Sequence, residues 1–332
     1  MKLNGVLTLS NLAISSLKRQ LNHPTRRNLD FLKLVLKRIT GMLFPHCEVI
    51  QIQNNIATIE IRRSCPLGSK GEIFCLPAGK FILESVRTIG SWEEDISNFL
   101  ARETTSALNY SSGEKRSDKS ASVTLLDLGA HVGLIPIQIA RNLFSQGEAT
   151  VKFNLILVEP MQQNMSPLQF NIGKLGYFSE VHFEQAAVSN HRGKTRIYRD
   201  SRDSGNTSLL RTNVAEENLI EEECKVIHIS DLGLKLHTDS KLLLKSDLQG
   251  LDAHVLSEMP EYIWQRIYAG VIEVGSKPEV SPVSVANVLR RLEPFEKYTS
   301  LNTKDTITPQ RIYDLWTDKS GREFNLFIRR PH

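Results

Sequence analysis

Residues 123–133, Val-Thr-Leu-Leu-Asp-Leu-Gly-Ala-His-Val-Gly, join an apolar run to an acid and two closely spaced glycines. The apolar run predicts a buried strand, and the glycines allow a tight turn that opens into a helix. Gly129 and Gly133 are spaced G-x-x-x-G, whereas a dinucleotide-binding turn carries G-x-G-x-x-G. The stretch therefore predicts a nucleotide-binding strand, loop and helix, and its spacing favours S-adenosylmethionine over a dinucleotide.

After this stretch, predicted strands and helices alternate, which is typical of a parallel sheet with helices on both faces. The end of the chain differs, because Arg311–Trp316 and Glu323–Arg330 flank a turn at Asp318–Gly321 and predict an antiparallel closing hairpin. The predicted strands are Val123–Leu128, Phe153–Val158, Val181–Val188, Leu242–Asp247 and Ala269–Val274, and the predicted helices are Gly133–Leu143, Met161–Leu175, Leu251–Ser257 and Pro282–Arg291.

The preceding residues predict a small α+β region. Asn54 and Asn55 predict a hairpin turn, and Asn28–Leu43 predicts an amphipathic helix. Residues 111–121 are polar and predict a flexible linker. We therefore expect an N-terminal region over residues 1–110, a linker over 111–121 and a methyltransferase-like sheet domain over 122–332.

Residues 1–40 carry eight basic side chains against one acid, although the net charge of the whole chain is only +4. That net charge is too small to predict a nucleic-acid partner. The basic amphipathic helix has two interpretations that stay open. It docks on the core or on a second copy in a homo-oligomer, or it lies on a membrane surface or a carrier protein.

The cysteines bear on compartment and metal content. None of the four lies in a C-x-x-C pair, which predicts a reducing compartment and no zinc site, with a Cys65–Cys75 disulfide as the alternative. No apolar run reaches the roughly 20 residues of a spanning helix, and residues 1–17 lack the apolar core of a signal peptide. We therefore expect a cytoplasmic protein.

Acids at strand ends are the candidate ligands of an adenosine cofactor. Asp127 would meet an ammonium group directly or through water, and Glu159 would accept hydrogen bonds from both ribose hydroxyls. Pro160 ends that strand, the helix beginning near Gly133 offers free N–H groups to a carboxylate, and Ala187 offers a small surface to adenine. A single acid at the end of a strand can equally cap a helix. The prediction therefore depends on Asp127, Gly129, Gly133 and Glu159 occurring together in this order.

The fourth predicted strand brings Lys245 and Asp247 to one face. Three roles suit Asp247: general base for an acceptor hydroxyl, metal ligand, or ion-pair partner of Lys245. Glu273 interrupts the apolar fifth strand. Because a buried carboxylate is costly unless it is paired, we expect Glu273 to pair with Lys245, with contact to the acceptor as the alternative.

These motifs resemble those of FkbM-type S-adenosylmethionine-dependent methyltransferases. Asp127–Gly133 is similar to D-V-G-A-N-x-G, Val158–Pro160 to V-E-P, and Lys245–Gly250 to K-I-D-V-E-G. Gly90–Glu93 resembles a G-x-W-E element that precedes the domain, so the likeness covers roughly residues 73–330. The ordered set of three motifs is specific, whereas each motif alone is not.

The resemblance implies a Rossmann-like class I methyltransferase fold and methyl transfer to a hydroxyl of a sugar or secondary metabolite, with Asp247 and Lys245 near the acceptor. A segment similar to Asp203–Ser208 lies over the cofactor in this family. The candidate cofactor-binding residues are then Asp127, Gly129, Ala130, His131, Gly133, Glu159, Pro160, Ala187, Asn206 and Ser208.

The chain departs from the family pattern at several positions. His131 stands where Asn is usual, Ser246 replaces an apolar residue, and Gln249, which cannot ionise, replaces the common Glu. Two other functions therefore stay open. One is a non-catalytic module that binds the cofactor, and the other is an NAD-dependent oxidoreductase, against which the missing G-x-G-x-x-G counts.

Overall fold

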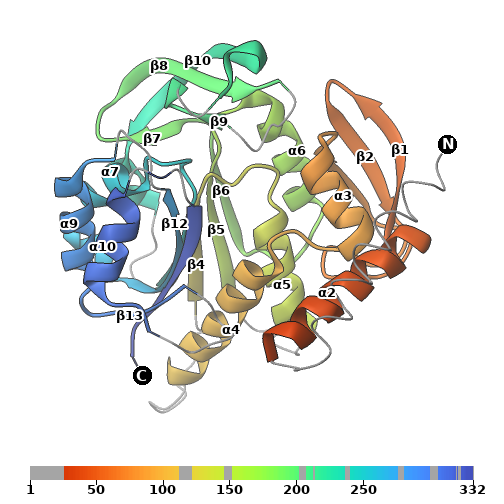
Figure 1. Cartoon of the computed structure of the whole chain (residues 1–332), viewed down its shortest axis with the longest axis horizontal. Coiled ribbons are helices and arrows are strands. Elements are labelled where there is room, and N and C mark those ends of the chain that lie inside the picture. Colours follow the sequence, from red (N-terminus) through yellow and green to blue (C-terminus); the bar gives the residue numbers. More distant parts are fainter. Residues whose placement is uncertain are drawn as a thin grey trace.

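A seven-stranded sheet forms the centre of the molecule (Figure 1). The computed structural model describes residues 26–111, 122–145, 152–201, 207–211, 214–235, 240–275, 280–299, 306–318, 320 and 323–331. Across the sheet the strands are β13 (Glu296–Tyr298), β14 (Glu323–Arg329), β12 (Ile267–Gly275), β11 (Lys241–Ser246), β4 (Ser122–Leu128), β5 (Lys152–Val158) and β6 (Glu180–Glu184). Strand β14 runs antiparallel to both neighbours, and the strands from β12 to β6 pair in parallel. This arrangement confirms the predicted Rossmann-like fold class.

Helices cover both faces of this sheet because each face is apolar. The core on one face includes side chains of α4 (Glu94–Ser111), α5 (Leu134–Ser145) and α6 (Gln162–Gly173). The core on the other face includes α7 (Asp252–Ser257), α8 (Glu261–Trp264), α9 (Pro282–Arg291) and α10 (Pro309–Thr317). The chain winds outward from β4 in one direction and from β11 in the other, so the strand order reverses between them. Such a reversal opens a crevice at the carboxyl ends of the strands.

The predicted closing hairpin is wrong in its first arm. Arg311–Trp316 belongs to α10, where the Thr308 hydroxyl caps the helix by accepting a hydrogen bond from Arg311 N at 3.2 Å. Ile312 and Trp316 lie one turn apart and are both fully buried, so a helical period accounts for their spacing. Strand β13, and not this segment, pairs antiparallel with β14 at the edge of the sheet.

A second sheet, which the sequence did not indicate, stands at the edge of the crevice. Its order is β7 (Ala187–Ser189), β10 (Leu219–His228), β8 (Gly193–Asp200) and β9 (Thr207–Ser208), with two 3-10 helices, η2 (Glu216–Asn218) and η3 (Ile229–Lys235), beside it. The predicted strand Val181–Val188 is therefore two strands, β6 in the central sheet and β7 in this one. Ion pairs between β8 and β10 join Lys194 to Glu223 and Arg199 to Glu222.

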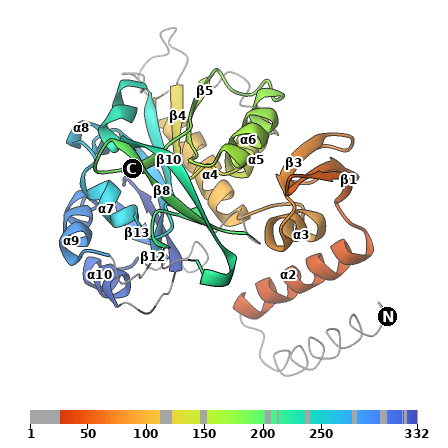
Figure 2. The same ribbon diagram turned by 90° about the horizontal axis from the view of Figure 1, so that it is seen from above.

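The N-terminal region is a three-stranded sheet with two helices, placed beside α5 and α6 (Figure 2). Asn54 and Asn55 form the hairpin turn with φ of 50° and 61°, as their sequence predicts. Asn171 of α6 exchanges two hydrogen bonds of 2.8 Å with the backbone of Cys75, so this region shares a core with the central sheet. Its elements are α2 (Arg26–Leu43), β1 (Cys47–Gln53), β2 (Ile56–Ile61), β3 (Ile73–Pro77) and α3 (Lys80–Ile89).

Helix α2 packs on α3 and leaves large apolar side chains exposed, among them Leu36, Met42 and Leu43. None of the helices in the described residues has the length and apolar content required to cross a bilayer. The two interpretations of this helix stay predictions. Cys65 and Cys75 are both free thiols, so the structure does not contain the alternative disulfide. The predicted linker falls mostly outside the described residues, since α4 ends at Ser111.

Candidate active site

A cavity of about 840 Å³ lies at the crevice where the strand order reverses. Its walls come from the β4–α5 turn, the ends of β5 and β11, the second sheet, and helices α2 and α3. Asp127 and Gly133 are not in its lining, and Asn206 falls outside the described residues. The predicted site residues that line it are Gly129, Ala130, His131, Glu159, Pro160, Ala187, Ser208, Lys245 and Asp247.

The turn after β4 brings three strand ends together. The backbone N–H groups of Gly129 and Ala130 donate to Val158 O at 3.0 and 2.9 Å, which ties this turn to the end of β5. Gly129 has a φ of +83°, and a Cβ there would lie 2.1 Å from the carbonyl oxygen of Asp247. Glycine is therefore required both by the left-handed backbone and by the close approach of β11.

His131 follows in the same turn with a φ of 50°. Asn and His both adopt this left-handed conformation more readily than most residues, so His131 can replace the Asn that is usual in the resembling family. Burial, and then the nearby charge of Lys245, lowers the pKa of His131 to about 4. The imidazole is therefore neutral at physiological pH.

Glu159, at the end of β5, is buried and holds three hydrogen bonds. Its carboxylate accepts from His131 N at 2.9 Å, Met161 N at 3.0 Å and Asn164 Nδ2 at 3.1 Å. Burial raises the pKa of Glu159 to about 7, although these bonds favour the ionised form. Asn164 also lines the cavity, and its buried Oδ1 has no donor among the described residues. This unsatisfied acceptor fits a bound molecule that brings a donor.

Lys245 links the ends of β4 and β11 from beneath the turn. Its Nζ lies 2.9 Å from Gly129 O, 3.1 Å from Asp127 Oδ1 and 3.8 Å from Asp247 Oδ2. Burial would lower the pKa of Lys245, but the charges of Asp127, Asp247 and Glu93 raise it above its ordinary value. Asp127 is fully buried behind Lys245, so the structure gives it the role of holding this ammonium group.

Asp247 lies directly after β11 and is hydrogen-bonded to two neighbouring side chains. Its Oδ1 accepts a hydrogen bond from Gln249 Nε2 at 2.9 Å. The predicted pairing of Glu273 with Lys245 is wrong, because Glu273 is hydrogen-bonded to Asp247 instead. Burial, and then the charge of Asp247, raises the pKa of Glu273 well above its ordinary value. Among the described residues, no three His, Cys, Asp or Glu side chains are arranged to hold a metal ion.

Asp252 stabilises the turn that carries Asp247 and was not predicted as a site residue. It is fully buried and accepts hydrogen bonds from Ser246 Oγ at 2.5 Å and Leu248 N at 3.2 Å. Burial raises the pKa of Asp252 to about 7. Ser246, which replaces an apolar residue of the family pattern, is thus the donor to Asp252 and helps to hold the turn that carries Asp247.

Glu93 is a second acid near Asp247 to which sequence reasoning assigned no role. It lines the cavity, and burial raises its pKa to about 7. The only signal was the G-x-W-E resemblance at residues 90–93, which carried no role.

No family model matches the chain, and no curated protein matches it either. Three of the solved structures that resemble it are 9–11% identical to this chain. A SAM-dependent O-methyltransferase from Thermotoga maritima is 11% identical, with a TM-score of 0.33, over 83% of this chain and 77% of that one. Fibrillarin from Aeropyrum pernix with natively bound S-adenosyl-L-methionine is 9% identical, with a TM-score of 0.31, over 85% and 97%. A geranyl diphosphate methyltransferase in complex with GPP and sinefungin is 10% identical, with a TM-score of 0.33, over 90% and 92%.

Proposed function

We propose that the chain is an S-adenosylmethionine-dependent methyltransferase of the FkbM type that methylates a hydroxyl group of a sugar or secondary metabolite. One observation supports this proposal above the others. Three segments far apart in the sequence line one cavity with the glycine turn at Gly129, the strand-end acid Glu159 and the pair formed by Lys245 and Asp247. The cofactor fits these residues, because Asn164 lines the cavity and its buried Oδ1 lacks a donor that a bound molecule can supply.

The residues divide into a cofactor side and an acceptor side. Glu159 would accept hydrogen bonds from ribose hydroxyls, since an ionised carboxylate offers two acceptor oxygens. When bound, S-adenosylmethionine supplies an activated methyl group. On the acceptor side, Asp247 would take the hydroxyl proton as general base, and the hydrogen bond from Gln249 Nε2 to its Oδ1 orients the carboxylate.

Calorimetry and a transfer assay together test this function. The chain should bind S-adenosylmethionine and S-adenosylhomocysteine, and NADH should give no heat. Asp247→Asn should lower methyl transfer to hydroxylated metabolites by about a hundredfold, because it removes a general base, and should leave S-adenosylhomocysteine affinity unchanged. Binding without any transfer by the wild type would instead favour the non-catalytic module, and binding of NADH alone would favour the oxidoreductase.

The raised pKa of Glu159 predicts that cofactor affinity depends on pH. A group with a pKa of about 7 is largely protonated at pH 6 and largely ionised at pH 8. Because only the ionised form offers both oxygens to ribose, S-adenosylhomocysteine should bind about tenfold more tightly at pH 8 than at pH 6. The measurement is calorimetry across this range, and Glu159→Gln should bind weakly at every pH. An equally steep pH dependence in Glu159→Gln would assign the effect to another group.

A further inference from the structure

The short connection between α3 and α4 carries two side chains into the cavity. Trp92 and Glu93 both line it, next to Met42 of α2 and Phe81 of α3. The N-terminal region and this connection therefore build one wall of the cavity.

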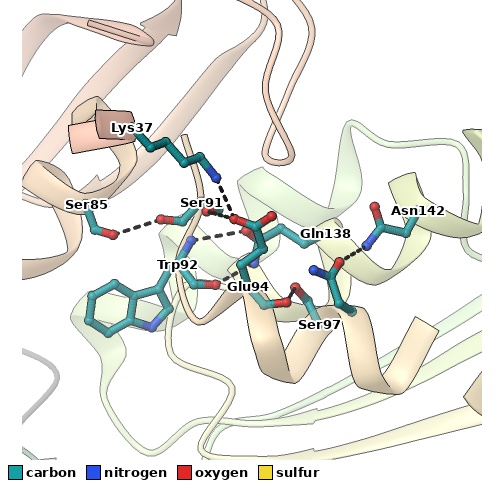
Figure 3. Close-up of polar contacts among 9 residues, drawn as sticks. Lys37, Ser85, Ser91, Trp92, Glu94, Ser97, Gln138 and Asn142 are labelled. Carbon is teal, nitrogen blue, oxygen red and sulfur yellow. Dashed lines mark hydrogen bonds and ion pairs between the residues drawn. The ribbon is translucent and has the colours of Figure 1, made fainter. Parts of the chain in front are cut away.

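Hydrogen bonds immobilise the residues on both sides of Glu93 (Figure 3). Gln138 of α5 accepts from Trp92 N at 3.1 Å and donates to Trp92 O at 2.7 Å. The carboxylate of Glu94 accepts from Lys37 Nζ of α2 and from Ser91 Oγ, each at 2.8 Å. Helices α2, α4 and α5 thus clamp this turn from three directions.

The clamp holds Glu93 in a conformation that costs energy. Its φ is 45°, a left-handed backbone that only glycine adopts freely and that Asn, Asp and His adopt more readily than other residues. Strain of this kind persists only where the surroundings impose it, and it concentrates at functional sites. The sequence offers no glycine at this position, although glycine would relieve the strain.

The carboxylate of Glu93 also lacks a hydrogen-bond donor among the described residues. Burial raises its pKa, and the charges of Asp247, Asp95 and Asp127 raise it as well, whereas the charge of Lys245 lowers it. Glu93 lines the same cavity as Lys245 and Asp247, so we place it on the acceptor side. A strained, half-buried acid that accepts no hydrogen bond costs stability, and the attraction of its charge to Lys245 offsets only part of that cost.

We propose that Glu93 contacts the methyl acceptor, where its carboxylate accepts a hydrogen bond from a donor next to the methylated hydroxyl. The proposal rests on the proposed function. The carboxylates of Asp247 and Glu93 are two hydrogen-bond acceptors near the same ammonium group, that of Lys245. The methyl acceptor that matches them therefore presents two neighbouring hydrogen-bond donors, as a vicinal diol or an amino alcohol does. In the transfer, the acceptor oxygen bonds to the methyl carbon as the bond between that carbon and sulfur breaks, and the hydroxyl proton passes to Asp247.

Glu93→Gln tests this role, with Asp95→Asn as the matched control. Asp95 is an exposed acid two residues away that does not line the cavity, so its replacement removes a nearby charge without touching the proposed contact. The probes are myo-inositol, methyl α-D-glucopyranoside and D-glucosamine, with phenol as a single-hydroxyl comparison. We expect Glu93→Gln to lower transfer to the first three at least tenfold, to keep S-adenosylhomocysteine affinity within twofold, and to raise the melting temperature. Glu93→Gly should raise it further, because glycine also relieves the strain.

Several outcomes would overturn the proposal. One is a melting temperature that Glu93→Gln lowers and Asp95→Asn does not. Another is a Glu93→Gln variant that transfers methyl groups as fast as the wild type. The last is a wild type that methylates phenol, or that methylates none of the three donor-rich probes. A wild type that binds neither S-adenosylmethionine nor S-adenosylhomocysteine would contradict the proposed function instead. The melting comparison needs no cofactor, so it would still separate a structural role of Glu93 from a functional one.

Discussion

Lys245→Met is expected to lower the free energy of unfolding by about 3–5 kcal/mol, the cost of breaking a buried ion pair by removing one partner. The side chains of Lys245 and Asp127 are 5% and 1% exposed, so Asp127 would be left as a buried charge without compensation. The variant would also leave Gly129 O without its donor at the centre of the site. Urea unfolding at pH 8, followed by far-UV circular dichroism, measures the loss.

The pH dependence of this loss has a definite sign. Burial raises the pKa of Asp127, and the charge of Lys245 opposes that rise, so the variant should raise it further. A carboxyl group whose pKa is higher in the folded than in the unfolded state lowers the free energy of unfolding when the pH is above the folded-state pKa. It has no such effect at a pH where the group is protonated in both states. The deficit of Lys245→Met should therefore shrink as the pH falls.

Two further variants control for side effects of Lys245→Met. Lys225→Met removes a 60% exposed partner of Glu184 and should change stability by less than about 1 kcal/mol, since exposed ion pairs contribute little. Adding Asp127→Leu to Lys245→Met should recover part of the loss by removing the unpaired charge. A loss no larger than that of Lys225→Met would contradict the buried pair as described.

Gly129→Ala is expected to cost about 2–5 kcal/mol, from about 1–2 for a left-handed residue with a Cβ and about 1–3 for overpacking. The added Cβ would meet the carbonyl oxygen of Asp247, which belongs to the backbone and cannot rotate away. The ends of β4 and β11 would have to separate, and with them Lys245 and Glu159. We expect binding of S-adenosylhomocysteine to disappear in calorimetry.

Gly71→Ala is the control for backbone strain alone. Gly71 has a φ of +90°, but nothing lies within 4 Å of its Cβ position. This variant should lose only the strain of about 1–2 kcal/mol and should bind S-adenosylhomocysteine normally. Equal losses of stability in the two variants would show that the contact with Asp247 O is not what requires glycine at position 129.

Features encoded by contiguous residues were predictable from the sequence. The strand, turn and helix around Gly129 depend on local apolar runs and on glycine conformation, and the hairpin at Asn54–Asn55 depends on two residues that accept a positive φ. Acids that end parallel strands of one sheet lie at the same edge of that sheet, which is why Glu159 after β5 and Asp247 after β11 line one cavity although β4 lies between the two strands.

Features that depend on distant packing were predicted wrongly or not at all. Arg311–Trp316 carries apolar residues whose spacing was assigned to a strand, and only burial of Ile312 and Trp316 on one face decides for a helix. Glu273 was assigned to Lys245 because both lie in neighbouring strands. Its actual partner is Asp247, since Asp127 already occupies the ammonium group.

The sequence by itself determined the sheet class, the glycine turn and the strand-end acids, because each is set by the conformational preferences of consecutive residues. Only the tertiary structure decided which charges neutralise one another and that Glu93 enters the cavity. Those outcomes depend on Gln138 and Lys37 reaching the same turn from two other helices, and on how deeply each carboxylate is buried. Desolvation and contacts across the fold set these energies, and neither is a property of a short stretch of chain.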